Sequence, residues 1–253
     1  MSRLPSSVKI AIVAALEREL HPLVRHWRAT VKEHAGRTFR FFEQAQLVVI
    51  CGGIGAEPAR RAAEAIIALY APEVVYSAGF AGALDPSLKV GDILIPARVI
   101  DAGDSSSVET GAGQGILVTF GAVATPEQKV KLGKSFNAQA VDMEASAVAR
   151  AAAARGVRFT AVKAISDEVG FALPGMNHRT GFIGPSGAFL TGKFARFIMI
   201  RPWTWAAALR LARNSKRAAY ALSAWLARTN FEPLNSPECS SGKRLAEKQN
   251  AEK

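Results

Sequence analysis

The sequence has 253 residues, 49% of them hydrophobic and 21% charged, which is enough for one large α/β domain or two small ones, with one the better expectation. Its two cysteines, Cys51 and Cys239, are too few for a disulfide framework or a zinc site, which favours a reduced cytoplasmic setting. The basic start and short apolar run lack a small-residue cleavage site, so we expect no signal peptide. No charge-free apolar stretch reaches the roughly 18 residues that a membrane span needs.

The net charge of +11 is concentrated in the C-terminal quarter of the chain. Between Glu168 and Glu232 there is no acidic residue, and the same stretch holds nine basic ones. They are Arg179, Lys193, Arg196, Arg201, Arg210, Arg213, Lys216, Arg217 and Arg228. Such a block can contact nucleic acid, an anionic membrane surface or an acidic ligand.

The first third of the chain alternates apolar strands with helices. Residues 8–15 are apolar and β-branched, which predicts a buried strand, and residues 16–27 predict a helix. A pair of short strands is expected within 37–50. Residues 48–70 predict a strand, a sharp turn made by glycines, and an alanine-rich helix. Residues 72–84 predict another strand, which we expect to end in a loop of small residues, GFAGA.

The rest of the chain continues the alternation as far as residue 165. We expect strands at 88–100, 116–120 and 157–165, helices at 126–135 and 143–155, and loops at 102–115 and 170–187. Strands that alternate with helices predict a single α/β domain with a central twisted mixed β-sheet, mainly parallel, flanked by helices on both faces. This domain would span residues 1–228, including a basic amphipathic segment at 194–228, before a polar, disordered tail at 229–253.

Several candidate site residues follow the predicted strands, and ligands bind beyond the carboxyl ends of strands in such sheets. Glu19 follows the first strand, Asp167 follows the strand at 157–165, and Glu144 opens a helix. A buried carboxylate without a partner is costly, so a structural partner or a ligand is expected for these acids. Taken singly, each has a structural explanation: a helix N-terminus stabilises Glu144, and Asp167 caps a turn. The four histidines show no metal-binding spacing, so we expect no metal.

The order of six motifs is more specific than any one of them. ALEREL, GGIG, GFAGAL, LKVGDILI, VDMEASAVA and AISDE resemble, in this order, the nucleoside phosphorylase / nucleosidase superfamily, and most nearly its methylthioadenosine/S-adenosylhomocysteine nucleosidases. The resemblance runs from residue 8 to about 168, with VDMEA and AISD its most specific elements. It implies an enzyme that cleaves the N-glycosidic bond of a purine nucleoside, has no cofactor and forms a homodimer.

The resemblance also implies a role for individual residues. Asp167 would be the general acid that protonates purine N7, and Glu144 would accept hydrogen bonds from the ribose hydroxyls. Met143 would pack against the sugar. Glu19 matches the residue that positions and activates the attacking water in the hydrolytic branch.

The sequence departs from the family pattern around the base and the nucleophile. Phe80 replaces the serine of the hydrolytic branch in the loop that ends at Gly82, and both are expected to line the substrate site. Ser77 stands where phosphorolytic hexamers have a phosphate-binding arginine. The position of the aromatic residue that stacks on the base falls at Ala122, and Val123 next to it is expected to line the substrate site.

Hydrolysis and phosphorolysis therefore both stay open. Glu19 favours water as the nucleophile. Arg18, Arg37 or Arg40 could instead hold phosphate as a co-substrate.

The segment 194–228 mixes aromatic and basic residues without acids, and it has two interpretations. It is either a terminal helix packed on the sheet with a solvated basic face, or a segment that lies on an anionic bilayer. In the second case Phe194, Phe197, Trp203 and Trp205 would reach the acyl boundary. It matches no nucleic-acid-binding motif.

With this segment the chain resembles the hopanoid-associated phosphorylases. That resemblance implies a lipid-linked nucleoside, adenosylhopane, as substrate and a peripheral place on the inner face of the cytoplasmic membrane. The alternatives are a plain methylthioadenosine/S-adenosylhomocysteine nucleosidase and an inactive nucleoside-binding or membrane scaffold protein.

Overall fold

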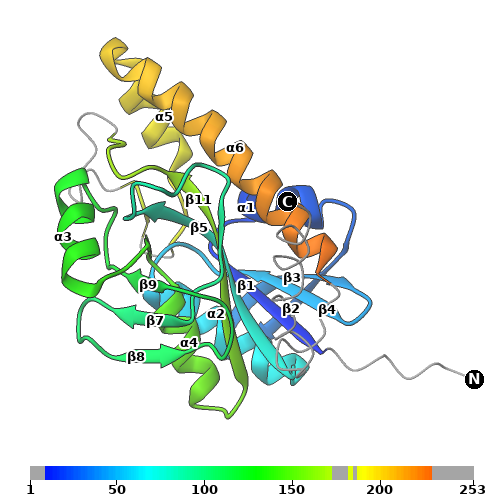
Figure 1. Cartoon of the computed structure of the whole chain (residues 1–253). Coiled ribbons are helices and arrows are strands. Elements are labelled where there is room, and N and C mark those ends of the chain that lie inside the picture. Colours follow the sequence, from blue (N-terminus) through cyan, green and yellow to red (C-terminus); the bar gives the residue numbers. More distant parts are fainter. Residues whose placement is uncertain (1–8, 173–181, 185–186, 230–253) are drawn as a thin grey trace, which may run out of the picture.

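The apolar strand predicted at the start of the chain lies at the centre of the molecule. In the computed structural model, which describes residues 9–172, 182–184 and 187–229, β1 (Ile10–Ala14) is buried along its whole length. It pairs in parallel with β4 (Leu47–Cys51) and β5 (Val74–Ala83) (Figure 1). A strand covered on both faces has to be apolar throughout, as IAIVA is.

The alternation of side chains along β1 divides the core into two layers. Ala11 and Val13 join a cluster with α2 (Ala56–Tyr70) and α4 (Ala145–Ala153) on one face of the sheet. The other residues of β1, Ile10, Ile12 and Ala14, join a second cluster with α1 (Glu17–Val24) and α6 (Trp205–Arg228) on the other face. Successive side chains of a strand point to opposite faces, so one short strand anchors both helical layers.

The sheet is mixed, as predicted. Its order is β2-β3-β4-β1-β5-β10-β9-β7-β8, and β11 pairs with β5 and β6 off this path. The β1, β4, β5 and β11 strands run parallel, whereas β10 is antiparallel to β5. The strands not yet given are β2 (Arg28–His34), β3 (Arg37–Gln44), β6 (Ile93–Leu94), β7 (Arg98–Asp101), β8 (Ser107–Glu109), β9 (Ile116–Thr119), β10 (Ala140–Asp142) and β11 (Arg158–Asp167).

The remaining helices are α3 (Pro126–Phe136), α5 (Thr191–Met199) and a short 3-10 helix, η1 (Pro202–Thr204), directly before α6. Among the described residues, no helix is both long enough and apolar enough to cross a membrane. The predicted tail beyond residue 229 and most of the predicted loop at 170–187 lie outside the described residues.

Three boundaries differ from the sequence-based expectation. The small residues 79–83 belong to β5 and do not form a loop, because β11 and β10 pair with the strand along this stretch. The segment 88–100 forms two short strands, β6 and β7, and the expected loop at 102–115 contains β8. The edge strand β2 was not predicted, because its exposed sequence RATVKEH has few apolar residues to signal a strand.

Candidate active site

One cavity of about 180 Å³ contains all seven residues predicted for the site. It lies where β1, β5 and β11 end. The structure thus brings the seven residues together at the ends of strands, as expected. The residues are Glu19 of α1, Phe80 and Gly82 of β5, Val123 after β9, Met143 and Glu144 before α4, and Asp167 of β11. Their chemical roles remain predictions.

Glu19 is a buried acid in the first turn of α1. Its Oε2 accepts a hydrogen bond of 3.4 Å from the backbone N–H of Leu16. Burial raises the pKa of Glu19 to about 7, although the nearby Lys163 ammonium acts in the opposite direction. A carboxyl group with a pKa near 7 is well matched to accept a proton from water at neutral pH.

The glycines of β5 make room for these side chains. A Cβ atom at Gly79 would lie 2.9 Å from Oε2 of Glu19, and one at Gly82 would lie 3.0 Å from Oδ2 of Asp167. The first distance is shorter than real Cβ contacts and the second is tighter than most of them, so a side chain at either position would push an acid away. The small-residue run GFAGA is therefore a strand whose missing side chains let two acids approach its backbone.

Glu144 is held by the glycine turn that precedes α2. The N–H of Gly55 donates a 2.9 Å hydrogen bond to Oε1 of Glu144, and the N–H of Met143 donates a 3.3 Å bond to Oε2. Burial, with the neighbouring Asp142 carboxylate, raises the pKa of Glu144 to about 7, although Lys163 opposes the shift. The turn at 52–55 thus binds a carboxylate of the protein itself at the start of a helix.

Two lysines near the acids, Lys163 and Lys129, were missed by the sequence analysis. The buried Nζ of Lys163 lies 2.8 Å from Oδ2 of Asp142 and donates a 3.1 Å hydrogen bond to Oγ of Ser77. Burial disfavours its charge, but the carboxylates of Asp142 and Glu144 outweigh this and raise its pKa. A lysine inside the apolar strand AVKAISD was the available signal, since a charged residue is almost never fully buried unless it is paired.

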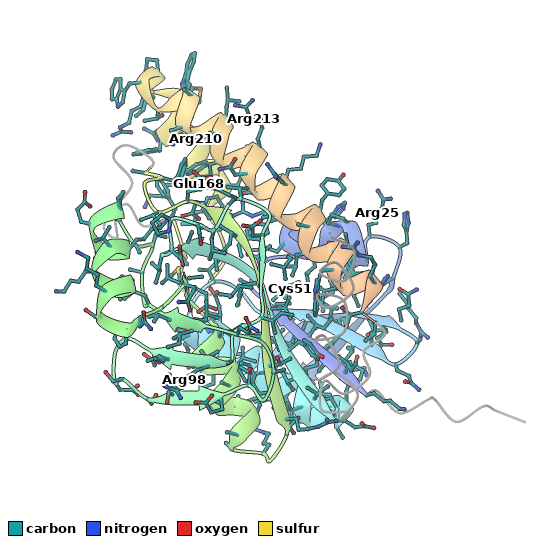
Figure 2. All side chains as sticks on the ribbon, viewed as in Figure 1. Arg25, Cys51, Arg98, Glu168, Arg210 and Arg213 are labelled. Carbon is teal, nitrogen blue, oxygen red and sulfur yellow. The ribbon has the colours of Figure 1, made fainter. Side chains whose placement is uncertain are left out.

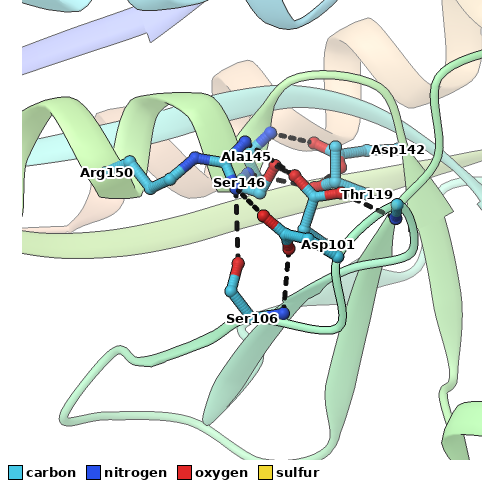
Figure 3. Close-up of polar contacts among 9 residues, drawn as sticks. Asp101, Ser106, Thr119, Asp142, Ala145, Ser146 and Arg150 are labelled. Carbon is cyan, nitrogen blue, oxygen red and sulfur yellow. Dashed lines mark hydrogen bonds and ion pairs between the residues drawn. The ribbon is translucent and has the colours of Figure 1, made fainter.

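Asp142 is structural, and its contacts fix where Glu144 lies. Its Oδ1 accepts a 2.7 Å bond from Thr119 Oγ1, and its Oδ2 accepts a 2.8 Å bond from the N–H of Ala145 (Figure 3). Ser146 and Arg150 of α4 then reach Asp101 of β7 at 2.9 and 2.7 Å. The start of α4 is therefore tied to two strands, and Glu144 directly before it has a defined position.

Asp167 has both carboxylate oxygens engaged. Oγ of Ser166 donates to Oδ1 at 2.7 Å, and Nζ of Lys129 is in close contact with Oδ2. The same Nζ also donates a 2.8 Å bond to the carbonyl of Glu168. The side chain of Lys129 is only 3% exposed. A buried cation therefore lies directly against the predicted general acid.

The sequence around Lys129 explains its placement. Thr125 and Gln128 form a capping box, in which Gln128 Oε1 accepts a 2.8 Å bond from the N–H of Thr125 and Thr125 Oγ1 accepts a 3.3 Å bond from the N–H of Gln128. Pro126 occupies the first turn, where its fixed φ suits a helix. The start of α3 is thus well defined, and Lys129 follows it by one turn toward Gly82.

A larger cavity of about 970 Å³ adjoins the small one. Six residues line both: Arg18, Ile54, Phe80, Ala122, Val123 and Met143. Its other walls are mostly apolar and come from the loop before α5, from α5 and from the inner face of α6, with Phe182, Phe189, Phe194, Ala208, Leu211 and Ala219 among them. A volume of this size is at the upper end for small-molecule pockets.

Of the three arginines considered for phosphate, only Arg18 lines these cavities. Its guanidinium lies 4.7 Å from the ring centre of Phe189. Arg40 instead pairs with Glu17 at 3.1 Å, and Arg37 lies at the exposed start of β3. Within the described part of the chain, no group of three or more His, Cys, Asp or Glu residues is placed to hold a metal ion.

Comparison with known proteins finds nucleosidases among the similar sequences. An aminodeoxyfutalosine nucleosidase from Campylobacter jejuni is 26% identical over 199 residues, which cover 64% of this chain and 87% of the relative. A 5'-methylthioadenosine/S-adenosylhomocysteine nucleosidase from Staphylococcus aureus is 28% identical over 197 residues, covering 62% and 86%.

Solved structures of similar proteins have the same fold. The 5'-methylthioadenosine/S-adenosyl homocysteine nucleosidase of Campylobacter jejuni matches with a TM-score of 0.61 and 21% identity over 87% of this chain and 98% of that one. The Helicobacter pylori enzyme of the same name, in a complex with a pyrrolo-pyrimidine compound, matches with a TM-score of 0.64 and 18% identity, covering 87% and 97%. The family model of the phosphorylase superfamily matches residues 9–127 and 109–182. The chain therefore belongs to the phosphorylase superfamily, a family of enzymes.

Proposed function

We propose that the protein cleaves the N-glycosidic bond of a purine nucleoside. In the reaction water adds to C1′ of the ribose and loses a proton, while the bond from C1′ to N9 breaks and the base leaves with a proton on N7. The observation that carries the proposal is the small cavity, which gathers two acids with a pKa of about 7 and a third acid paired with a buried lysine. The names of the two relatives reported above, both nucleosidases, support it.

The contacts in the cavity suit the predicted roles. Glu19 would take the proton from water, and Glu144, already accepting hydrogen bonds from backbone N–H groups, would accept those of the ribose hydroxyls. Asp167, with Lys129 against it, would deliver the proton to N7. The positive charge of Lys163 lies beside Glu19 and Glu144 and opposes the rise in their pKa values that burial causes.

Water is the nucleophile that the residues favour. Ser77 stands at the position where phosphorolytic hexamers have a phosphate-binding arginine. Its Oγ accepts a hydrogen bond from Lys163, so the side chain already has a partner within the protein. Phosphate as a co-substrate remains the alternative, with Arg18 as the cation that would meet it. The two reactions differ in product, because hydrolysis yields a free ribose and phosphorolysis yields a ribose 1-phosphate.

The substituent on C5′ is proposed to be large and apolar. The cavity of about 970 Å³ shares a wall with the small one and is lined mainly by apolar side chains. A methylthio group would leave most of it empty, whereas a triterpene tail would use it, so we propose adenosylhopane as the substrate. The enzyme would meet this lipid at an anionic membrane surface on the cytoplasmic side, as a homodimer.

The second candidate is a methylthioadenosine/S-adenosylhomocysteine nucleosidase, and the names of the relatives favour it. The two candidates separate by substrate. Purified protein is incubated with adenosylhopane in detergent and, separately, with methylthioadenosine, and adenine release is measured with and without phosphate. We expect adenine from both and faster turnover of the lipid, with ribose rather than ribose 1-phosphate as the sugar product.

Efficient turnover of methylthioadenosine with none of adenosylhopane would reject the lipid substrate but keep the reaction. Absence of adenine from every adenosine derivative would reject the reaction itself. It would favour the inactive nucleoside-binding or scaffold protein.

A further inference from the structure

The connection between α5 and α6 exposes a group of large apolar side chains. We call residues 199–209 the hairpin tip. Five of its side chains are more than half exposed: Met199 at 68%, Ile200 at 60%, Trp203 at 67%, Trp205 at 51% and Leu209 at 65%. Among the described residues only Val31 and Tyr220 are large apolar side chains of comparable exposure, and they stand outside the tip. A contiguous apolar group of this kind marks an interaction site.

The tip has a fixed shape although it exposes apolar side chains. The Trp205 indole N–H donates a 3.0 Å hydrogen bond to the carbonyl of Ile198, which joins the two helices. Phe194 and Phe197 pack edge-on against Phe182, with ring centres 5.4 and 5.1 Å apart. These two phenylalanines were predicted to reach a bilayer, but both are half-buried and Phe194 also lines the large cavity. Met199, Ile200 and Leu209 take their place on its surface.

The charged residues in the sequence around the tip are all positive. Residues 191–228 contain eight lysines and arginines and no acid. Arg210 and Arg213 are exposed on α6, near the end of the helix that projects from the body (Figure 2). With a rise of about 1.5 Å per residue, Arg213 is roughly 12 Å along α6 from Trp205. In a membrane interface the acyl chains lie deeper than the phosphates. The hairpin has the same order, with Trp205 at its end and the two arginines about one to two helical turns further along α6.

The two halves of α6 have different surroundings. Ala218, Leu222 and Leu226 are buried in the core with α1. The first half continues past the body of the molecule toward the tip (Figure 1). Its inner face lines the large cavity through Ala208, Leu211 and Ala212. The large cavity therefore lies between the hairpin tip and the acids of the small cavity.

We propose that the hairpin tip inserts into the interface of an anionic phospholipid bilayer. Trp203, Leu209 and their apolar neighbours enter the acyl boundary, and Arg210 and Arg213 contact phosphate groups. An apolar substrate then passes from the bilayer along α5 and α6 into the large cavity. This last step rests on the proposed function, whereas binding of the tip to lipid does not.

The test is co-sedimentation of the purified protein with vesicles of phosphatidylglycerol and phosphatidylcholine, and with vesicles of phosphatidylcholine alone. We expect binding to the anionic vesicles that weakens as salt rises, and much weaker binding to the neutral ones. Each basic residue near an anionic surface strengthens binding about fivefold, so Arg210→Gln with Arg213→Gln is expected to weaken it roughly 25-fold. Trp203→Ser with Leu209→Ser is expected to weaken it at least as much.

Matched controls lie elsewhere on the surface. Val31→Ser removes a side chain as exposed as that of Leu209 from β2, and Arg25→Gln with Arg28→Gln removes two exposed charges far from the tip. Neither control is expected to change vesicle binding. Asp167→Asn should bind vesicles like the wild type, so failure of the proposed reaction leaves this result intact.

Two outcomes would overturn the proposal. One is wild-type protein that ignores anionic vesicles at low salt, or that binds them equally well in the tip variants and the controls. The other is a change of oligomeric state in the tip variants, measured by light scattering, without vesicle binding by the wild type. That result would make the tip a contact between copies of this chain.

Discussion

The small cavity with the acids and the large apolar cavity beside it are built from different parts of the chain. The small one is formed by strand ends and helix starts within residues 15–167, which lie inside the stretch matched by the family model. The large one takes much of its wall from α5 and α6, beyond residue 182 where that match ends. The proposed chemistry and the proposed choice of substituent therefore rest on largely different residues. Variants of residues that line only one cavity should leave the work of the other intact.

The largest effect is expected from the acid at the end of β11. Asp167→Asn removes a proton donor while keeping the shape, so adenine release should fall by about 10²–10⁴-fold. Thermal melting checks that the variant is folded, and Asp104→Asn, on an exposed loop, is the matched control with unchanged turnover. Near-normal turnover in Asp167→Asn would remove this residue from the mechanism.

Variants of Lys129 show whether Asp167 needs its buried lysine partner for catalysis. Lys129→Met removes the ammonium that contacts Asp167, and we expect turnover to fall by about 10²-fold, the lower end for positioned proton transfer. Lys129→Arg should recover part of the loss, and the pH dependence of kcat should change in the methionine variant. If only the melting temperature changes, Lys129 has a structural role alone.

Glu19 makes folding stability depend on pH. Its pKa is about 7 in the folded protein against an ordinary 4.5, so between these values the unfolded chain releases a proton that the folded one keeps. This contribution to stability is complete below pH 4.5 and is lost as pH rises toward 7. Urea unfolding at pH 5 and pH 8 should show a loss that is about 2 kcal/mol smaller in Glu19→Gln. Identical losses in the two proteins would show that burial does not shift this acid.

The smallest effect concerns the large cavity, and it should depend on the substrate. Ala208→Trp fills part of the wall made by α6, so kcat/KM for adenosylhopane should fall roughly tenfold, in the range of lost apolar pocket contacts. Turnover of methylthioadenosine should stay within about twofold, because the acids are untouched. An equal loss for both substrates would mean that the two cavities are not independent.

The strands and helices of the core could be read from the sequence because each is a local pattern. IAIVA is apolar at every position, and the T-P-E-Q start of α3 carries its own cap. The edge strand β2 and the strand character of GFAGA could not be read in this way. Pairing with β3 makes the first a strand, and pairing with β10 and β11 makes the second one.

The sequence by itself determined the family, the mixed sheet and the acids of the small cavity, because these follow from the residue types and from the order of the motifs along the chain. Only the tertiary structure decided which groups hold them. Gly55 and Glu144 are 89 residues apart, Ser77 and Lys163 are 86 apart, and Lys129 and Asp167 are 38 apart. It likewise turned Phe194 and Phe197 inward and left Met199, Ile200 and Leu209 exposed. Hydrogen bonds and burial depend on the distance through space, which the sheet sets by bringing distant strand ends together.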